Sequence, residues 1–233
     1  MKTLGIIGGL GPQTTSKIYL SVVDLVRKSG KNKYPPIVIY NLPFPFIIED
    51  EAIIQGINSD KMLPYLISGA KILEKAGASF GILPCNTLHK YIEEIRASVK
   101  IPFLSILEET LLELRKRSIK TVGILATQST VDSQIYSNIL QKTEIKVLYP
   151  TKTEQNYINS SIVRALKGEI NFNNKKIKII FDSLHKKDAE AILLACTDLR
   201  IVTLKIKSPI PMIDTTQILI KASVRELIGN HKL

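Results

Sequence analysis

Two cysteines, Cys85 and Cys196, are the only thiols of this 233-residue chain, and each stands between an apolar run and a polar turn. Cys85 lies within residues 83–87 (LPCNT) and Cys196 within residues 194–198 (LACTD). A lone free cysteine usually behaves as a small buried apolar residue. A thiol just after a buried strand has a second use, because open α/β sheets bind their ligands at the carboxyl ends of strands.

An internal repeat places the two cysteines at equivalent positions. Three segments of the first half match three segments of the second half in the same order, at offsets of 109 to 118 residues. The matching segments are residues 4–7 with 122–125, residues 81–85 with 191–196, and residues 101–103 with 210–212. Two cysteines are unlikely to fall at matching strand ends by chance, so the repeat favours a functional pair of thiols.

Short apolar runs alternate with longer amphipathic stretches, which is typical of βα units that build a parallel sheet. The predicted fold class is therefore α/β, in two halves of similar topology. Strands are predicted near residues 2–7, 36–41, 79–84, 102–105, 120–126, 145–149, 190–195 and 210–213. Helices are predicted over residues 13–29, 59–76, 87–98, 107–117, 130–141, 154–167, 173–186 and 215–228. Because a helix follows the last strand, we expect it to pack back on the first half, which gives lobes of residues 1–103 plus 214–233 and residues 104–213.

Composition and hydropathy restrict the class of protein. With 45% hydrophobic and 23% charged residues, the chain resembles an ordinary soluble globular protein. Its longest nearly apolar run, residues 37–48, is too short to span a membrane, and the N-terminus shows no signal peptide. Reduced thiols and a cytoplasmic location are therefore expected. The net charge of +11 is spread along the chain without a nucleic-acid-binding motif, so neither nucleic acid nor membrane is expected as a partner.

Other uses of the two thiols fit the sequence less well. A zinc site needs further Cys or His ligands at short spacing, whereas His89, His185 and His231 are predicted on helices or at the chain end. A redox couple favours a Cys-x-x-Cys spacing, and a nucleophilic cysteine needs a histidine base beside it. No metal site is therefore expected, and a symmetric pair of acid and base groups remains.

The segments around these cysteines resemble a known family. The motifs that carry the resemblance are residues 1–12 (MKTLGIIGGLGP), residues 84–87 (PCNT) with His89, residues 125–127 with Thr130, and residues 196–198 (CTD). Together they are similar to aspartate racemases of the aspartate/glutamate racemase superfamily, over essentially the whole chain. The Cys-Asn-Thr element is fairly specific, whereas the glycine-rich opening alone is weak. The resemblance implies two similar three-layer αβα lobes with parallel four-stranded sheets in pseudo-twofold relation, an active site between them, no pyridoxal phosphate or metal cofactor, and a homodimer.

The same resemblance implies a cofactor-independent amino-acid racemase, first of all an aspartate racemase, with Cys85 and Cys196 as its catalytic acid and base. Inverting a carbon by proton exchange needs a base on one face and an acid on the other, and a thiol pKa of about 8.5 allows both states. Cys196 is expected to deprotonate the L enantiomer and Cys85 the D enantiomer. The substrate-binding residues implied are Leu10, Asn86, Thr87, Thr127, Thr130, Lys167 and Thr197. N-capping is an equal alternative for the threonines and the asparagine, as is a solvated helix end for the lysine.

Two departures leave the substrate open. Some aspartate racemases carry an arginine in the loop after the second strand, but residues 43–50 (PFPFIIED) contain no basic residue. The common Cys-Thr-Glu of the second half is here Cys-Thr-Asp, at residues 196–198. Specificity for glutamate or an uncharged amino acid, a related isomerase or decarboxylase, and a non-catalytic amino-acid-binding protein are the alternatives.

A nucleotide-binding oxidoreductase is suggested by the glycines of residues 8–11, but the match fails in detail. Thr14 stands where the third glycine of the dinucleotide-binding motif belongs, and Pro12 interrupts the turn. The second strand ends in Tyr40 and Asn41, without the acidic residue that would hold a ribose.

Overall fold

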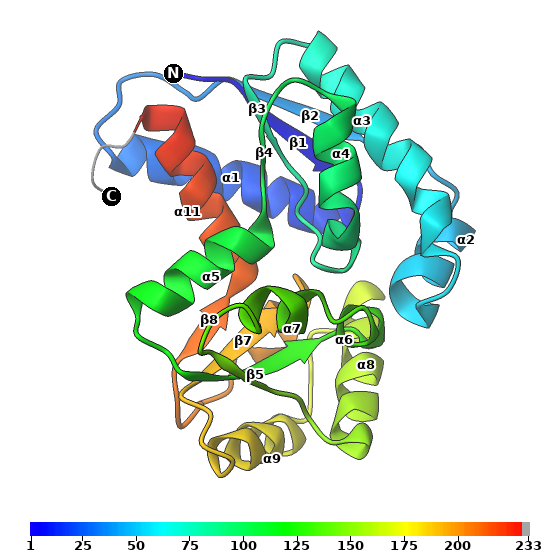
Figure 1. Ribbon diagram of the computed structural model, residues 1–233, viewed down its shortest axis with the longest axis vertical. Helices are drawn as coiled ribbons and strands as arrows, with labels where there is room; N and C mark the ends of the chain where they lie inside the picture. Colours follow the sequence, from blue (N-terminus) through cyan, green and yellow to red (C-terminus); the bar gives the residue numbers. More distant parts are fainter. Residues whose placement is uncertain (230–233) are drawn as a thin grey trace.

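The computed structural model describes residues 1–229. Residues 230–233, which include His231 and the end of the predicted first lobe, lie outside this range. Two four-stranded sheets, each entirely parallel, form the two lobes that are seen one above the other in Figure 1. We call them the first lobe, built on strands β1 to β4, and the second lobe, built on strands β5 to β8. The predicted α/β fold with two four-stranded parallel sheets is confirmed.

The first sheet has the strand order β2-β1-β3-β4. Its strands are β1 (Leu4–Gly8), β2 (Ile37–Asn41), β3 (Phe80–Ile82) and β4 (Phe103–Leu104). Every residue of β1 is buried, as expected for a parallel strand that is covered on both faces. Ile6 packs with α1 (Pro12–Lys28) and α11 (Thr215–Ile228) on one face, and Ile7 packs with α3 (Leu63–Lys75) and α4 (Ile92–Ser98) on the other.

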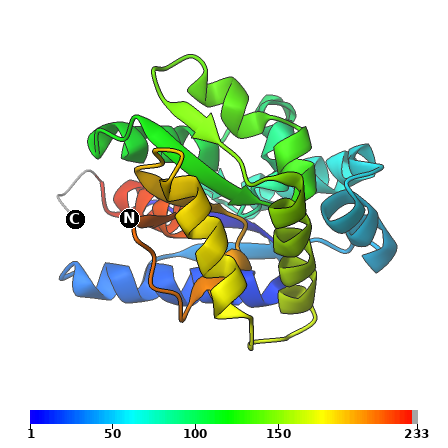
Figure 2. The same ribbon diagram turned by 90° about the horizontal axis from the view of Figure 1, so that it is seen from below.

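The second sheet has the matching order β6-β5-β7-β8. Its strands are β5 (Thr121–Ala126), β6 (Lys146–Leu148), β7 (Ala191–Ala195) and β8 (Met212–Asp214). One face packs against α8 (Lys152–Leu166), α9 (Asn174–His185) and α10 (Leu199–Thr203). The other face joins the core shared with the first lobe, through α5 (Ile106–Lys116), α7 (Ile135–Leu140) and α11. In the view from below, α8 and α9 cover the outer side of this sheet (Figure 2).

Packing explains why the sequence repeat has a glycine in the first strand of each sheet, Gly5 in β1 and Gly123 in β5. A Cβ atom on Gly5 of β1 would lie 2.9 Å from the Cβ of Ala78, just after the end of α3. A Cβ atom on Gly123 of β5 would lie 3.0 Å from a methyl of Leu184 in α9. The first strand of each sheet thus lacks a side chain where a covering helix or its C-terminal turn approaches closely.

Several helices differ from the prediction. The predicted single helix over residues 130–141 is wrong, because α6 (Gln128–Asp132) ends before Gln134, which has a left-handed backbone with φ 53°, and α7 follows. The predicted helices 59–76 and 87–98 each begin with a 3-10 turn, η2 (Ser59–Met62) and η3 (Thr87–Tyr91). Residues 43–50, expected as a loop, turn helical at Phe46 in α2 (Phe46–Glu49), which continues as the π-helical η1 (Asp50–Gln55).

Helix α11 connects the lobes. It follows β8 of the second sheet and packs against α1 of the first lobe and against α5. Its bounds, Thr215–Ile228, confirm the predicted helix over residues 215–228. The division into lobes of residues 1–103 plus 214–233 and residues 104–213 stays a prediction.

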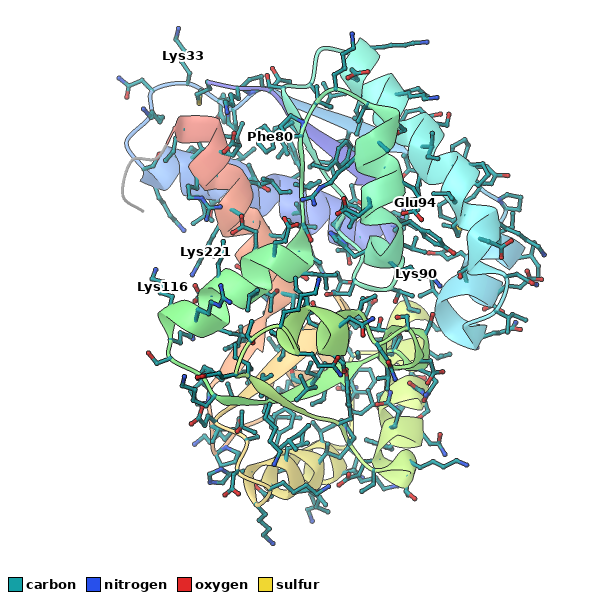
Figure 3. All side chains as sticks on the ribbon, in the orientation of Figure 1. Lys33, Phe80, Lys90, Glu94, Lys116 and Lys221 are labelled. Carbon is teal, nitrogen blue, oxygen red and sulfur yellow. The ribbon has the colours of Figure 1, made fainter. Side chains whose placement is uncertain are left out.

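The surface carries its lysines on separate elements. Lys33, Lys116 and Lys221 project from the loop before β2, from α5 and from α11, while Phe80 lies in the interior of the first lobe (Figure 3). Within the described part of the chain, no helix is both long and apolar enough to cross a membrane.

Candidate active site

The two cysteines line one cavity between the lobes. Cys85 follows β3 and Cys196 follows β7, strands that have the same place in the two sheet orders. Both thiols are free and partly buried. The residues that line the cavity are Leu10, Gly11, Glu49, Ile53, Cys85, Asn86, Thr87, Thr127, Ile162, Leu166, Ala195, Cys196, Thr197 and Asp198. Its volume is small, about 40 Å³.

Three threonine hydroxyls form a buried triangle that joins the lobes at this cavity. Thr87 Oγ1 lies 3.1 Å from Thr127 Oγ1 and 2.9 Å from Thr130 Oγ1, and the last two oxygens are 2.9 Å apart. Thr127 is also the N-cap of α6, since its hydroxyl accepts the backbone N–H of Thr130. A hydroxyl rotates to suit its acceptor, so these groups can turn their hydrogens towards a carboxylate that enters the cavity.

Asn86 connects the loop of the first cysteine to the second lobe. Its side-chain oxygen accepts the Tyr136 hydroxyl at 2.5 Å, and its amide donates to Thr215 Oγ1 at 3.1 Å. The Thr215 hydroxyl in turn donates to the carbonyl of Leu194, two residues before Cys196. This buried network links the two cysteine loops to each other, which fixes their relative position.

His89 holds the backbone of Cys85. The Ile106 backbone N–H, at the start of α5, donates to His89 Nε2 at 3.0 Å, so Nδ1 carries the ring hydrogen and donates to the Cys85 carbonyl at 2.7 Å. The side chain is 1% exposed, and burial lowers the pKa of His89 to about 4. The ring is therefore neutral at physiological pH and joins the loop of Cys85 to α5.

The pKa of each thiol is raised above its ordinary value, which favours the protonated form at neutral pH. Burial raises the pKa of Cys85 to about 11, although the backbone N–H groups of Leu88 and Thr87 act in the opposite direction. Burial also raises the pKa of Cys196, and the neighbouring charge of Asp198 raises it further. The charge of Cys85 also contributes to the raised pKa of Cys196, so the first thiol acts electrostatically on the second.

Two carboxyl groups reach the cavity from opposite lobes. Glu49 lies at the end of α2 in the first lobe, and Asp198 lies at the start of α10 in the second. Asp198 accepts the Thr197 hydroxyl at 3.4 Å and lies 4.0 Å from the Cys196 sulfur. Burial raises the pKa of both carboxyl groups, and the charge of Asp198 adds to the raised pKa of Glu49.

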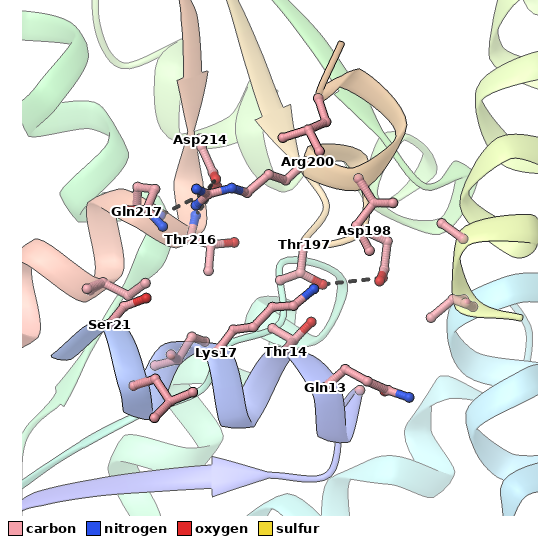
Figure 4. A pocket seen from close by; sticks show the side chains of 18 of the residues that line it. Gln13, Thr14, Lys17, Ser21, Thr197, Asp198, Arg200, Asp214, Thr216 and Gln217 are labelled. Carbon is pink, nitrogen blue, oxygen red and sulfur yellow. Dashed lines mark hydrogen bonds and ion pairs between the residues drawn. The ribbon is translucent and has the colours of Figure 1, made fainter. Parts of the chain in front are cut away.

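A wider cleft adjoins the cavity on the side of Asp198. It has a volume of about 470 Å³ and shares Gly11, Leu166, Thr197 and Asp198 with the cavity. Lys17 enters it from α1 and extends towards Thr197 and Asp198, while Arg200 extends towards Asp214 from the other lobe (Figure 4). The charge of Lys17 lowers the pKa of Asp198, although burial has the larger effect in the opposite direction.

The structure brings most of the predicted site residues together. Of those residues, Cys85, Cys196, Leu10, Asn86, Thr87, Thr127 and Thr197 line the cavity, and Thr130 contacts two of them. Lys167 is exposed at the C-cap of α8 and lines neither the cavity nor the cleft. Lys167 is therefore a solvated residue at a helix end, which was the alternative given for it in the sequence analysis.

Sequence reasoning missed Glu49 and Asp198 as cavity residues. Asp198 stands two positions after Cys196, so its closeness to the thiol was readable from the motif. Glu49 belongs to the segment that was expected to be a loop, and no pattern indicated that its side chain reaches the cysteines. Among the described residues no group of three or more His, Cys, Asp or Glu side chains is placed to hold a metal ion, and independence of cofactors stays a prediction.

Comparison with known proteins identifies the family. The model of the Asp/Glu/hydantoin racemase family matches residues 7–223. A broad specificity amino-acid racemase, RacX of Bacillus subtilis, is 34% identical over 228 residues, which are 95% of this chain and 96% of the relative. An aspartate racemase homologue from Pyrococcus horikoshii has a TM-score of 0.79 at 27% identity, covering 97% of this chain and 99% of its own. The aspartate racemase of Picrophilus torridus has a TM-score of 0.77 at 27% identity, covering 100% and 96%. The chain therefore belongs to the Asp/Glu/hydantoin racemase family, and it is an amino-acid racemase, an isomerase.

Proposed function

We propose that the protein racemises amino acids without a cofactor, by proton transfer between the substrate α-carbon and the thiols of Cys85 and Cys196. The observation that carries the proposal is that the cysteines come from equivalent strand ends of two lobes and line one cavity. Two such groups can approach a bound α-carbon from opposite faces, which inversion requires.

The reaction needs one thiolate and one thiol. The thiolate removes the α-proton and becomes a thiol, and the electron pair stays on the planar α-carbon and its carboxylate. The other thiol then delivers its proton to the opposite face and becomes the thiolate. The cysteines have exchanged protonation states, so the next turnover runs from the other enantiomer or follows proton exchange with water.

The surrounding residues support this chemistry. The hydroxyls of Thr87 and Thr127 are the donors that an α-carboxylate would meet, and stabilising that carboxylate favours the carbanion beside it. Asp198, close to Cys196, is the acceptor for the α-ammonium group. That ammonium group would offset the negative charges that now raise the thiol pKa values.

The test is a screen of amino acids in deuterated water, with the protein dialysed against EDTA and no cofactor added. We expect deuterium at the α-carbon and the appearance of the opposite enantiomer, and neither with the Cys85→Ala/Cys196→Ala double variant. Aspartate, the substrate that the sequence resemblance implies, belongs in the panel with glutamate, neutral and basic amino acids. Amino-acid binding without exchange of any α-proton would contradict the proposal and indicate a binding protein.

The homodimer implied by the sequence also belongs to this proposal. Light scattering after size exclusion should give about twice the chain mass of 26.0 kDa. A mass of one chain at working concentration would contradict it.

A further inference from the structure

Three consecutive acidic residues, Glu49, Asp50 and Glu51, have different surroundings. Asp50 accepts the Gln55 amide at 2.9 Å. Glu51 pairs with Lys61 at 3.0 Å and accepts the Asn58 amide at 3.0 Å. Glu49 has no comparable side-chain partner within the described range, and it is the acid of the three that lines the cysteine cavity.

The charges that act on Glu49 are negative. Asp198 and Asp50 both raise the pKa of Glu49, after the larger effect of burial, and only the backbone N–H of Gly11 lowers it. Asp198 differs, because it has Lys17 on the side of the open cleft. No Lys, Arg or His side chain of residues 1–229 lines the cavity itself. The cavity therefore offers an unbalanced carboxylate to whatever enters it.

The segment that carries Glu49 contacts both lobes. The Glu51 pair with Lys61 joins the segment to η2 within the first lobe. At its other end Gly56 reaches the second lobe, where a Cβ on Gly56 would lie 3.4 Å from the Cβ of Ser129 in α6. Glu49 thus faces the cysteines from the first lobe, while Asp198 faces them from the second.

We propose that Glu49 binds a cationic group on the substrate side chain, so that the site prefers diamino acids such as lysine and ornithine over dicarboxylic amino acids. The inference rests on the proposed racemase function and names its substrate class. The threonine triangle would receive the α-carboxylate, Asp198 the α-ammonium and Glu49 the side-chain ammonium.

Charge balance supports this assignment. A diamino acid brings two positive groups to a cavity that holds two acids, so Glu49 and Asp198 each obtain a partner. Aspartate would place a second carboxylate in the same cavity without a cation to receive it, which leaves like charges facing each other. Residues 43–50 lack the arginine that some aspartate racemases carry, and they provide the carboxylate of Glu49 instead. The site therefore prefers a substrate side chain that is positively charged over one that is negatively charged.

The test compares Glu49→Gln with the unchanged protein on lysine and on norleucine, which has a chain of similar length without the terminal charge. We expect kcat/KM for lysine to fall at least about 20-fold, mainly through KM, because the variant loses a hydrogen bond between charged groups. The value for norleucine should change less than about 3-fold. Asp50→Asn is the matched control, since it removes a neighbouring charge that does not line the cavity, and it should leave both substrates within about 2-fold.

The outcomes separate this inference from the racemase proposal. If Glu49→Gln lowers kcat/KM for lysine and for norleucine equally, Glu49 binds the α-ammonium or supports the fold, and the inference is wrong. Aspartate racemised better than lysine by the unchanged protein would also overturn it, although the racemase proposal would stand. If the unchanged protein exchanges no α-proton in any amino acid, the racemase proposal itself fails. Circular dichroism and thermal unfolding show that each variant is folded.

Discussion

The two cysteine loops have the same position in their lobes but are held in different ways. The residue four positions after Cys85 is His89, and the residue four positions after Cys196 is Arg200. Each contacts the start of the helix that follows the last strand of its sheet. His89 accepts the N–H of Ile106 in α5, whereas Arg200 approaches the carboxylate of Asp214, the N-cap of α11, at 3.7 Å.

The two contacts differ in burial and in charge. His89 is 1% exposed, neutral, and also bound to the carbonyl of Cys85. The Arg200 side chain is 58% exposed and lies in the open cleft. The duplicated topology has therefore kept the place of the contact while its chemistry has diverged. The backbone of Cys85 is held by the buried, neutral His89, which we call the buried clamp, and Cys196 is next to a solvent-exposed ion pair and the wide cleft.

The largest expected effect is the fall in racemisation when either thiol is replaced. Cys85→Ser and Cys196→Ser should each lower racemisation at least about 1,000-fold in both directions, because each cysteine is the base in one direction and the acid in the other. Deuterium exchange of a single enantiomer should persist in each variant. Cys196→Ser should retain exchange of the D form, and Cys85→Ser exchange of the L form, as the sequence resemblance implies. Racemisation near the original rate in either variant would refute the two-base mechanism.

A smaller effect should follow from replacing the buried clamp. His89→Leu leaves the Ile106 N–H and the Cys85 carbonyl without partners and should destabilise the protein by about 2–4 kcal/mol. His89→Gln provides a new donor and acceptor and should restore part of that loss. Urea unfolding at pH 7 measures the stability of both variants. Equal stability of His89→Leu and the unchanged protein would show that the hydrogen bonds of His89 do not stabilise the fold.

The same histidine predicts a pH dependence of stability. Its folded pKa of about 4 lies below the ordinary value of 6.5, so the unfolded chain binds the proton first as pH falls. The stabilisation present above pH 6.5 is lost as pH approaches 4, by up to about 3 kcal/mol for this residue. Unfolding free energies between pH 7 and pH 4.5 should fall less steeply for His89→Gln. If the curves of unfolding free energy against pH are parallel for His89→Gln and the unchanged protein, the histidine is not buried in its neutral form.

Much of this arrangement was predictable because it depends on local patterns. The apolar runs, the paired Gly5 and Gly123 and the matching cysteines predicted two similar sheets with a thiol at one strand end of each. The break of the helix at Gln134 was not predictable, because a left-handed backbone at glutamine depends on packing around it. Glu49 was missed for a similar reason, since its place depends on a segment that is held by contacts with η2 and with α6.

Asn86 shows a different limit of the sequence prediction. Asn86 directly follows Cys85 in the sequence and was predicted to bind substrate, and the structure adds that its amide group is already bonded to Tyr136 and Thr215. These partners lie 50 and 129 residues away along the chain, and only the folded contact between lobes brings them to Asn86. A motif thus locates a residue at a site, but the choice between binding a ligand and joining two lobes depends on distant residues.

A small effect is expected on the pH profile of the enzyme. The charge of Glu49 contributes to the raised pKa of Cys85. In Glu49→Gln that contribution is absent, so the thiolate forms at lower pH, and the alkaline rise of kcat/KM for norleucine should move slightly to lower pH, by an amount that keeps the change at a fixed pH within about 3-fold. Asp50→Asn should leave the profile in place. A rise that moves to higher pH would show that Glu49 does not act on the thiol through its charge.

The smallest expected effect concerns the exposed partner in the second lobe. Arg200→Gln removes an ion pair whose atoms are 3.7 Å apart and whose arginine is largely in solvent, and such pairs contribute about 0–1 kcal/mol. Asp214 still caps α11 through the backbone N–H groups of Thr216 and Gln217, so the helix start should persist. Urea unfolding should therefore separate Arg200→Gln from the unchanged protein by less than about 1 kcal/mol, well below the loss in His89→Leu. If the two losses are equal, the contrast between a buried clamp and a solvent-exposed contact is wrong. The repeated position four residues after each cysteine would then have one structural role in both lobes, whatever side chain occupies it.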